Sequence, residues 1–372
     1  MANWKFSTSH TQSFKECARL GFLTYYYGGK GLTRKGLNLA QSTGTLCHRI
    51  LALGLQDHLG LDGICQRQIE VWRAEIFEAG LDAEVPELGY EISRQSALAE
   101  ALCRAWFKIR FPFIQNFYEI LEIEEEQEID LGNGQILMTR PDIGALRRKS
   151  DGELVALEFK TTGKNSQNFF ESWRYSTQTL THLLALEHKY KVKGASVLME
   201  FLYKGYKKWN KLREMDIYYS PLIRGRKVTE PFGGTSVYLW DEKSGVAFDP
   251  WTEMSMKEWI EEKVPEQVLG EHLFTKEVFR NDIEIERWIR QTRIQQWNIQ
   301  KGTYALRGAP TEEVATEIMD EYFPGNFDQS CFSNKYFEKC VMLPICWGQI
   351  DDPLGSREYV ERKPHHPREF EA

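Results

Sequence analysis

An unbroken apolar run that ends in charged residues is the feature that most constrains this sequence. Leu154–Leu157 contains four apolar residues in succession, which is typical of a strand buried on both faces of a sheet. The run leads directly into Glu158 and Lys160, and Asp142 lies sixteen residues before Glu158. Buried charges are costly unless they are paired or bind a cation. The end of this strand is therefore a candidate site.

The patterns around this run predict a mixed α/β sheet. Alternating or continuous apolar stretches indicate strands at about 119–130, 135–146 and 153–160, with turns at 131–134 and 147–153. Residues 168–190 have the periodicity of an amphipathic helix, and 194–205 read as a further buried strand. The order of three strands, a helix and a strand favours a sheet with both parallel and antiparallel neighbours.

The rest of the chain is dominated by helical patterns. We expect helices over 36–59 and over most of 66–118, and again over 252–322. We therefore expect one domain over residues 1–350. It would have a helical insert at 60–118, an α/β core at 119–220 and a helical C-terminal part at 252–350, and a mobile polar tail would follow at 351–372.

Composition narrows the class of protein. The 372 residues are 42% hydrophobic and 27% charged, as in soluble globular proteins, and no stretch approaches the 18 apolar residues of a membrane span. We see no signal-peptide pattern, and the seven cysteines are an odd number, so we expect a reducing, cytoplasmic location. The net charge of −7 does not favour binding of a nucleic acid by the chain as a whole. Such a partner would have to bind a local basic patch.

The alternation of side chains along a strand puts Glu158 and Lys160 on one face. If the preceding strand pairs antiparallel through the turn at 147–153, Asp142 can lie within a few ångströms of Glu158. Two carboxylates that close repel each other unless a cation lies between them, and Mg²⁺ or Mn²⁺ prefers such oxygen ligands. A neighbouring lysine can orient water or stabilise developing charge. An exposed Glu–Lys pair at a strand end is the alternative that the spacing leaves open.

The stretches "PDIGA" and "LVALEFKTT" resemble the PD-(D/E)xK nuclease superfamily, specifically its RecB-like branch. That branch includes the AddB nuclease domain and the CRISPR-associated exonucleases. The resemblance implies a restriction-endonuclease-like core and metal-dependent hydrolysis of DNA phosphodiester bonds. It also implies that Asp142, Glu158 and the carbonyl of Phe159 bind the metal, and that Lys160 positions the attacking water.

Two further stretches match the same branch in the same order. "GTLCHRIL" resembles its Gly-x-x-x-His signature through Gly44 and His48, which implies that His48 is a metal ligand. From the residues alone, an exposed histidine remains the alternative. "WRYSTQTLTHLLA" resembles the glutamine-containing helix after the Glu-x-Lys strand, and Gln178 would support the site or hold the DNA backbone. Many members have tyrosine where this chain has His182, four residues after Gln178 on the same helical face.

Four cysteines resemble the iron–sulfur staple found in part of this branch. Cys17 precedes the histidine motif, and Cys331, Cys340 and Cys346 lie near the C-terminus. The resemblance implies a [4Fe–4S] cluster that joins the two ends of the chain. Eight residues separate Cys331 from Cys340, whereas members of the branch often have two. A Zn²⁺ site and unrelated core cysteines remain the alternatives.

Several residues are candidates for contact with DNA, in single-stranded form or at an end. They are Lys164, Tyr175, His182, Lys204, Lys207 and Lys208. A solvated basic face is the alternative for the lysines. We expect the acidic stretch 122–130 to be solvated as well.

The combined pattern indicates a deoxyribonuclease that acts as an exonuclease in DNA repair, recombination or phage-type DNA processing. The alternative is a non-cleaving DNA-binding or complex-forming protein that keeps the nuclease fold. The complete set of Asp142, Glu158 and Lys160 favours cleavage. The sequence leaves open whether a helicase or recombination partner takes part.

Overall fold

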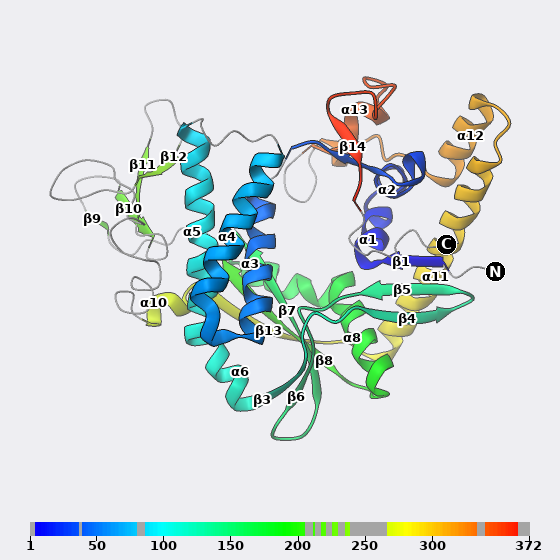
Figure 1. The fold of residues 1–372 in the computed structure, drawn as a ribbon. Coiled ribbons are helices and arrows are strands. Elements are labelled where there is room, and N and C mark those ends of the chain that lie inside the picture. The colour runs from blue at the N-terminus through cyan, green and yellow to red at the C-terminus, as the bar shows by residue number, and fades with distance from the viewer. Residues whose placement is uncertain are drawn as a thin grey trace.

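A mixed sheet of five strands lies at the centre of the described part of the computed structural model (Figure 1). Its order is β13-β8-β7-β6-β3. β7 runs parallel to β8, and every other neighbouring pair in this sheet is antiparallel. This arrangement confirms the predicted α/β fold with a restriction-endonuclease-like core.

The structure describes residues 4–36, 39–79, 86–204, 211–212, 217–220, 225–229, 235–238, 266–332 and 339–363. The strands are β1 (Trp4–Ser7), β2 (Leu32–Arg34), β3 (Tyr118–Glu122), β4 (Gln127–Gly132), β5 (Gln135–Thr139), β6 (Ile143–Arg148), β7 (Leu154–Thr162), β8 (Ser196–Tyr203), β9 (Lys211–Leu212), β10 (Ile217–Ser220), β11 (Gly225–Thr229), β12 (Thr235–Tyr238), β13 (Leu273–Phe279) and β14 (Tyr359–Glu361). The α-helices are α1 (Thr8–Glu16), α2 (Ala18–Tyr25), α3 (Leu39–Gln56), α4 (Leu61–Glu78), α5 (Pro86–Ile109), α6 (Phe111–Phe117), α7 (Gln167–Ser172), α8 (Thr177–Tyr190), α10 (Glu266–Gly270), α11 (Asp282–Arg307), α12 (Glu312–Tyr322) and α13 (Leu343–Cys346). Short 3-10 helices lie at Tyr27–Gly29, His58–Gly60, Trp173–Tyr175 and Gln329–Cys331.

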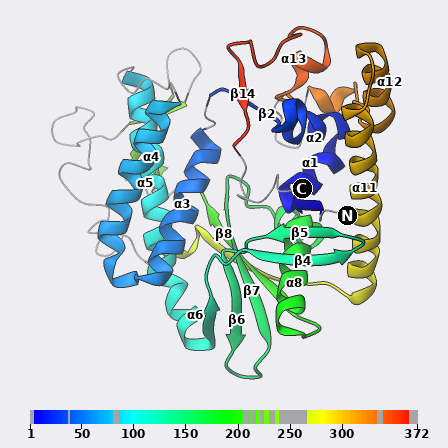
Figure 2. The ribbon, with the colours of Figure 1, turned by 45° about the vertical axis from the view of Figure 1, so that its right-hand side comes forward.

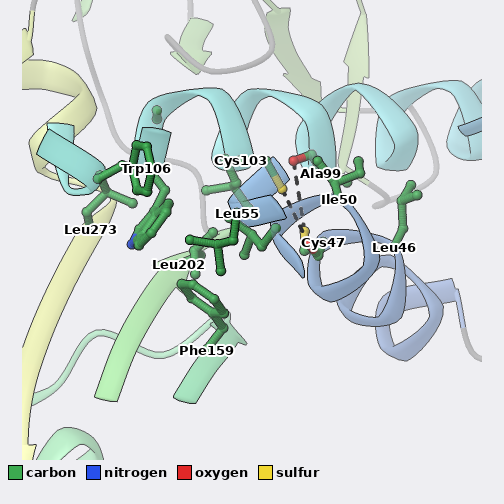
Figure 3. Packing of buried hydrophobic residues seen from close by; sticks show 14 of the residues in the cluster. Leu46, Cys47, Ile50, Leu55, Ala99, Cys103, Trp106, Phe159, Leu202 and Leu273 are labelled. Carbon is green, nitrogen blue, oxygen red and sulfur yellow. Dashed lines mark hydrogen bonds between the residues drawn. The ribbon is translucent and has the colours of Figure 1, made fainter. Parts of the chain in front are cut away.

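Helices cover both faces of the central sheet. On one face, α3 and α5 pack on β7 and β8, where Phe159 and Leu202 meet Trp106 in a buried cluster (Figure 3). On the other face, α8 packs Leu183 and Leu186 against apolar residues of β7 and β8. Because helices cover both faces of the sheet, β7 can carry apolar side chains on both of its faces. The apolar run at Leu154–Leu157 lies in this strand.

Proline separates two strands where we expected one. The apolar pattern over 135–146 predicts a single strand, but β5 ends at Thr139 and β6 begins at Ile143. Pro141 has no N–H to donate and restricts Arg140 before it, so the ladder is interrupted there. β5 joins a separate sheet with β1 and β4, while β6 enters the central sheet. Asp142 therefore lies at the junction of the two sheets.

The expected strand over 119–130 and the expected helix over 168–190 are also divided. β3 and β4 belong to different sheets, and Glu124 between them has a left-handed φ of 48°. The helix is interrupted before α8, where the side chain of Ser176 accepts a hydrogen bond from the backbone N–H of Gln178. This N-cap gives α8 a defined start beside the end of β7.

The C-terminal part differs from the expected all-helical region. β13 adds an edge strand beside β8, and α11 and α12 follow it along the side of the molecule that carries α1 and α2 (Figure 2). Residues 359–361, which we expected in a mobile tail, form β14 and pair antiparallel with β2. Tyr359 is buried there. The last residues, 364–372, lie outside the described part.

None of the helices in the described part of the chain combines the length and apolar character needed to cross a lipid bilayer.

A second apolar cluster joins the N-terminal segment to α11. It includes Phe6, Phe14, Leu137 and Ile299, and His10 of α1 lies beside it with its Nε2 atom 2.8 Å from the hydroxyl of Tyr26. Burial, and second the positive charge of Arg362, lower the pKa of His10 from 6.5 to about 3. The folded chain therefore holds this ring in its neutral form.

We predict that His10 makes the fold sensitive to acid. Between pH 6.5 and pH 3 the unfolded chain binds a proton at this residue that the folded chain does not, so stability falls as the pH is lowered through this window. From pH 7 to pH 5 the loss should be about 2 kcal/mol. Urea unfolding of the wild type and His10→Gln at both pH values measures the difference. His58→Gln, at an exposed histidine, is the control, and equal pH dependence in wild type and His10→Gln would contradict the prediction.

Candidate active site

The pairing of β6 with β7 brings the two predicted carboxylates together. Ile143 pairs with Leu157, so Asp142 stands beside Glu158 at the end of the ladder. One Asp142 oxygen, Oδ2, accepts a hydrogen bond from the backbone N–H of Phe159 at 2.7 Å. Both carboxylates are buried, with 9% of Asp142 and 2% of Glu158 exposed to solvent. The strand end therefore holds two neighbouring acids with little solvation.

α3 supplies the predicted histidine. Nδ1 of His48 lies 2.8 Å from Oδ1 of Asp142, so this side chain faces the acids instead of solvent. Gly44 lies one helical turn earlier and contacts β7, where a Cβ atom at Gly44 would lie 2.9 Å from Oγ1 of Thr161. The glycine thus lets α3 approach β7 closely enough for His48 to reach Asp142.

Three side chains surround Glu158. Lys160, on the same face of β7, places Nζ 2.7 Å from Oε1 of Glu158. The amide nitrogen of Gln178 in α8 donates to the same oxygen at 2.5 Å. Nδ1 of His182, one turn further along α8, lies 3.5 Å from Oε2. The structure therefore brings together Asp142, Glu158, Lys160, His48 and Gln178, as predicted from the sequence.

The charges around the two acids shift their pKa values in opposite directions. For Asp142, burial raises the pKa, but the charge and hydrogen bond of His48 and the charge of Lys160 outweigh it, and the pKa falls to about 2. For Glu158, burial and the negative charge of Asp142 raise the pKa to about 7 against the opposing charges of Lys160 and His48. For His48, burial lowers the pKa, but the charge and hydrogen bond of Asp142 give a net rise. The site can thus hold either one or two negative charges near neutrality.

His182 differs from its predicted role in DNA contact. Its side chain is buried, and burial, the largest of its opposing causes, lowers its pKa to about 3, so the ring is neutral. Nδ1 has no hydrogen-bond partner among the described residues. The ring lies below the groove surface against Glu158, where it can support the carboxylate.

Glu124 is a nearby carboxylate that the sequence did not point to. We expected the stretch 122–130 to be solvated, but Glu124 is half-buried, and its backbone N–H donates to the carbonyl oxygen of Asp142 at 3.1 Å. Burial raises its pKa, against the charge of Arg140, and Asp142 and His48 are its further electrostatic neighbours. The left-handed φ of this non-glycine residue marks it as a candidate site residue, but this angle can be seen only in the structure and not in the sequence.

A groove of about 1180 Å³ opens over the strand end. Lys160, Gln178 and His182 form part of its floor. Its other lining residues include Ser7, Thr8, Gln12, Ser13, Arg140, Lys164, Trp173, Tyr175, Thr177 and Lys204. Lys164, Tyr175 and Lys204 thus lie where we expected DNA contacts, whereas Lys207 and Lys208 lie outside the described residues. Burial lowers the pKa of Lys204.

Two of the four cysteines from the ends of the chain are in contact, and within the described residues no three of the four are arranged as they stand to hold a metal ion. The backbone N–H of Cys340 donates to the carbonyl oxygen of Cys331 at 2.8 Å. Burial raises the pKa of Cys346 to about 11, and the charges of Cys340, Cys17 and Cys331 add to this rise. Burial also raises the pKa of Cys340, again with Cys17 and Cys331 as contributors. Cys47, Cys65 and Cys103 are buried in the core between α3, α4 and α5.

The donor set at the strand end suits a hard divalent cation. Among the described residues, no group of three or more His, Cys, Asp or Glu side chains is arranged as it stands to hold a metal ion. Both acids are instead neutralised by donors of the protein, namely His48, the N–H of Phe159, Lys160 and Gln178. Two buried carboxylates and an imidazole nitrogen are ligands that Mg²⁺ or Mn²⁺ accepts, so the residues fit such an ion.

Comparison with known families agrees with this geometry. The model of the PD-(D/E)XK nuclease superfamily matches residues 5–218, which is more than half of the chain and contains the whole strand-end site. The chain belongs to the PD-(D/E)XK nuclease superfamily. Members are generally metal-dependent nucleases that typically use ions such as Mg²⁺, which indicates nuclease activity and a nucleic-acid substrate. No curated protein matches the chain.

The close contact of Gly44 with Thr161 gives a testable prediction for this nuclease-superfamily site. Alanine is the better helix former by about 1 kcal/mol, yet Gly44→Ala should lower the free energy of unfolding by about 1 kcal/mol, because the added methyl group overpacks the contact with β7. Combining it with Thr161→Ala, which removes the opposing hydroxyl, should restore stability. Chemical denaturation of both single variants and the double variant measures this coupling.

Gly63→Ala in α4 is the matched control, since a Cβ atom there would meet only the flexible Arg67 side chain at 3.5 Å or more. If Gly44→Ala and Gly63→Ala stabilise the protein equally, the close approach of α3 to β7 is not what requires glycine.

Proposed function

We propose that the chain is a DNA exonuclease of the RecB-like type that depends on Mg²⁺ or Mn²⁺. The observation that carries the proposal is the pair of adjacent buried acids, Asp142 and Glu158, with Lys160 beside them on the floor of an open groove. A purely structural ion pair would not need two acids with opposed pKa shifts directly behind a lysine that lines a groove.

The residues divide into ligands and supporting groups. Asp142, Glu158, His48 and the carbonyl oxygen of Phe159 would hold the metal ion. When bound, this ion would lower the pKa of a bound water and stabilise negative charge at phosphorus. Gln178 holds Glu158 in place from α8 through a hydrogen bond, and the neutral ring of His182 lies beside the carboxylate.

Lys160 is the group best placed to act on the reacting atoms. Its ammonium lies 2.7 Å from Glu158 and 5.5 Å from the centre of the Trp173 ring, so it is held at the groove floor on two sides. From there it can orient the attacking water and stabilise charge on the phosphate oxygens. Lys164, Lys204 and Tyr175 would contact the DNA along the groove.

We expect Glu158→Gln and Lys160→Met each to lower the rate of DNA hydrolysis at least about 100-fold, because each removes a group that stabilises the transition state. The measurement is degradation of end-labelled single- and double-stranded DNA with Mg²⁺ or Mn²⁺. Glu317→Gln, on the outer side of α12, is the matched control and should keep full activity.

Wild-type activity in all variants would contradict the assignment of the site. Binding of DNA by the wild type without cleavage of any substrate would favour the alternative, a non-cleaving DNA-binding protein.

Cys17, Cys331, Cys340 and Cys346 are the ligands that we propose for a [4Fe–4S] cluster. Cys340 and Cys346 pack against the apolar cluster that contains Leu23 of α2, so that the helix beginning directly after Cys17 lies in the same region, although the four thiols would have to move together to bind a metal. Four thiolates suit either this cluster or Zn²⁺, and either would join α2 to the segment around α13.

Anaerobically purified protein should be brown and contain iron and acid-labile sulfide, at roughly four irons per chain. Cys340→Ser should remove the iron, and Cys65→Ser, at a buried cysteine of the core, should keep it. Stoichiometric zinc without sulfide would replace the cluster with a Zn²⁺ site, and absence of both metals would exclude a shared metal site.

Roles in DNA repair, recombination or phage-type processing are consistent with an exonuclease of this type. A helicase or recombination partner would supply separated strands to such an enzyme.

A further inference from the structure

Three segments far apart in the sequence meet at one end of the groove. Lys15 of α1 places Nζ 3.4 Å from Oγ1 of Thr177, the first residue of α8. Arg280, between β13 and α11, places its guanidinium 5.7 Å from the centre of the Tyr175 ring. Tyr175 and Thr177 both line the groove. Two cations therefore border the groove next to the N-terminal turn of α8.

Arg280 is a buried cation with one nitrogen that has no hydrogen-bond partner among the described residues. Its side chain is only 9% exposed, and the nitrogen concerned is Nε. The carboxylate of Glu284 lies 3.9 Å away, but it accepts the backbone N–H of Asn281 in the capping box of α11. A guanidinium whose nearest carboxylate among the described residues lies 3.9 Å away and is shared with a backbone N–H keeps positive charge that a nearby anion would balance.

Lys15 adds a second positive charge that no carboxylate neutralises within the described residues. Its ammonium lies 5.1 Å from the centre of the Trp288 ring. Loss of hydration, and second the charge of Arg280, lower its pKa. The amino end of α8 adds a third positive contribution through its helix dipole. These three groups repel one another unless an anion lies among them.

Tyr175 lies beside this charge with its ring open to solvent. The residue is 70% exposed, and the guanidinium of Arg174 lies 5.9 Å from its centre. An exposed aromatic ring bordered by guanidinium groups is a surface on which an unpaired base can stack. Bases of a duplex are already stacked on one another and cannot use it without being separated.

We propose that Lys15, Arg280 and the first turn of α8 form a phosphate subsite, and that Tyr175 is the adjoining base platform. Together they bind an internal nucleotide of single-stranded DNA that leads to Asp142 and Glu158. This inference rests on the proposed nuclease function and names its substrate as a single strand.

The test measures binding of fluorescein-labelled oligo-dT to the full chain in EDTA, so that no cleavage takes part. Lys15→Gln/Arg280→Gln should reduce the slope of log affinity against log salt concentration by roughly 0.7 for each phosphate contact that is lost. Tyr175→Ala should weaken binding about 5-fold to 100-fold with little change in this slope, and Tyr175→Phe should bind as the wild type does.

The control is Arg147→Gln/Lys149→Gln, which removes the same charge from the turn at the opposite end of β7 and should leave the slope unchanged. Arg280→Lys keeps the charge and should keep most of the slope, which separates loss of phosphate contact from loss of folding. An unchanged slope in Lys15→Gln/Arg280→Gln would overturn the proposal. A reduced slope that is seen only with 5′-phosphorylated oligonucleotides would also overturn it, because the bound phosphate would then be a terminal one.

The outcomes also distinguish this inference from the nuclease assignment. If the wild type cuts DNA but Lys15→Gln/Arg280→Gln leaves the salt slope unchanged, the nuclease assignment stands and the phosphate subsite is wrong. If Lys15→Gln/Arg280→Gln reduces the salt slope but the wild type cuts no substrate, the phosphate subsite stands and the nuclease assignment is wrong.

Discussion

The contact between the start of β6 and the middle of β7 is the constraint on which the rest of the site depends. It holds Asp142 and Glu158 side by side while both are nearly excluded from water. Two acids in this position would destabilise the fold if nothing opposed their charge. The neighbouring elements supply that opposition, with His48 from α3, Lys160 from β7 itself and Gln178 from α8.

The two faces of the central sheet serve different purposes as a result. On the α3 and α5 face, Leu157 and Phe159 belong to an apolar cluster that packs β7 against these two helices (Figure 3). On the α8 face, Lys160 lines the groove, and Glu158 lies behind it in contact with Gln178 of α8. Side-chain alternation in one strand therefore builds both the core and the candidate active site.

Local patterns in the sequence predicted this part of the molecule because its determinants are local. The apolar run before Glu158, the Gly44–His48 spacing on one helical turn, and the Gln178–His182 pair on α8 each lie within one element. A short hairpin and one crossover bring Asp142, Glu158 and Gln178 together, whereas His48 arrives through the long-range packing of α3 on β7. The split at Pro141 was within reach of the same reasoning, because proline rarely continues a central strand.

Other features depend on contacts between distant segments and carried no local signal. The sequence around β13 reads as helical, yet β13 becomes a strand because the edge of β8 offers it a ladder. Glu124 approaches Asp142 because it adopts a left-handed backbone conformation between β3 and β4. Lys15 and Arg280 meet only when α1 and the start of α11 pack on α8. The cysteines approach one another although their spacing departs from the expected pattern.

Crystals of the protein soaked with Mn²⁺ test the central claim most directly, through the anomalous scattering of the ion. The account predicts an anomalous peak in contact with the carboxylates of both Asp142 and Glu158, with His48 turned toward it, and loss of that peak in Glu158→Gln. Mn²⁺ bound only elsewhere, or a peak that persists unchanged in Glu158→Gln, would contradict it.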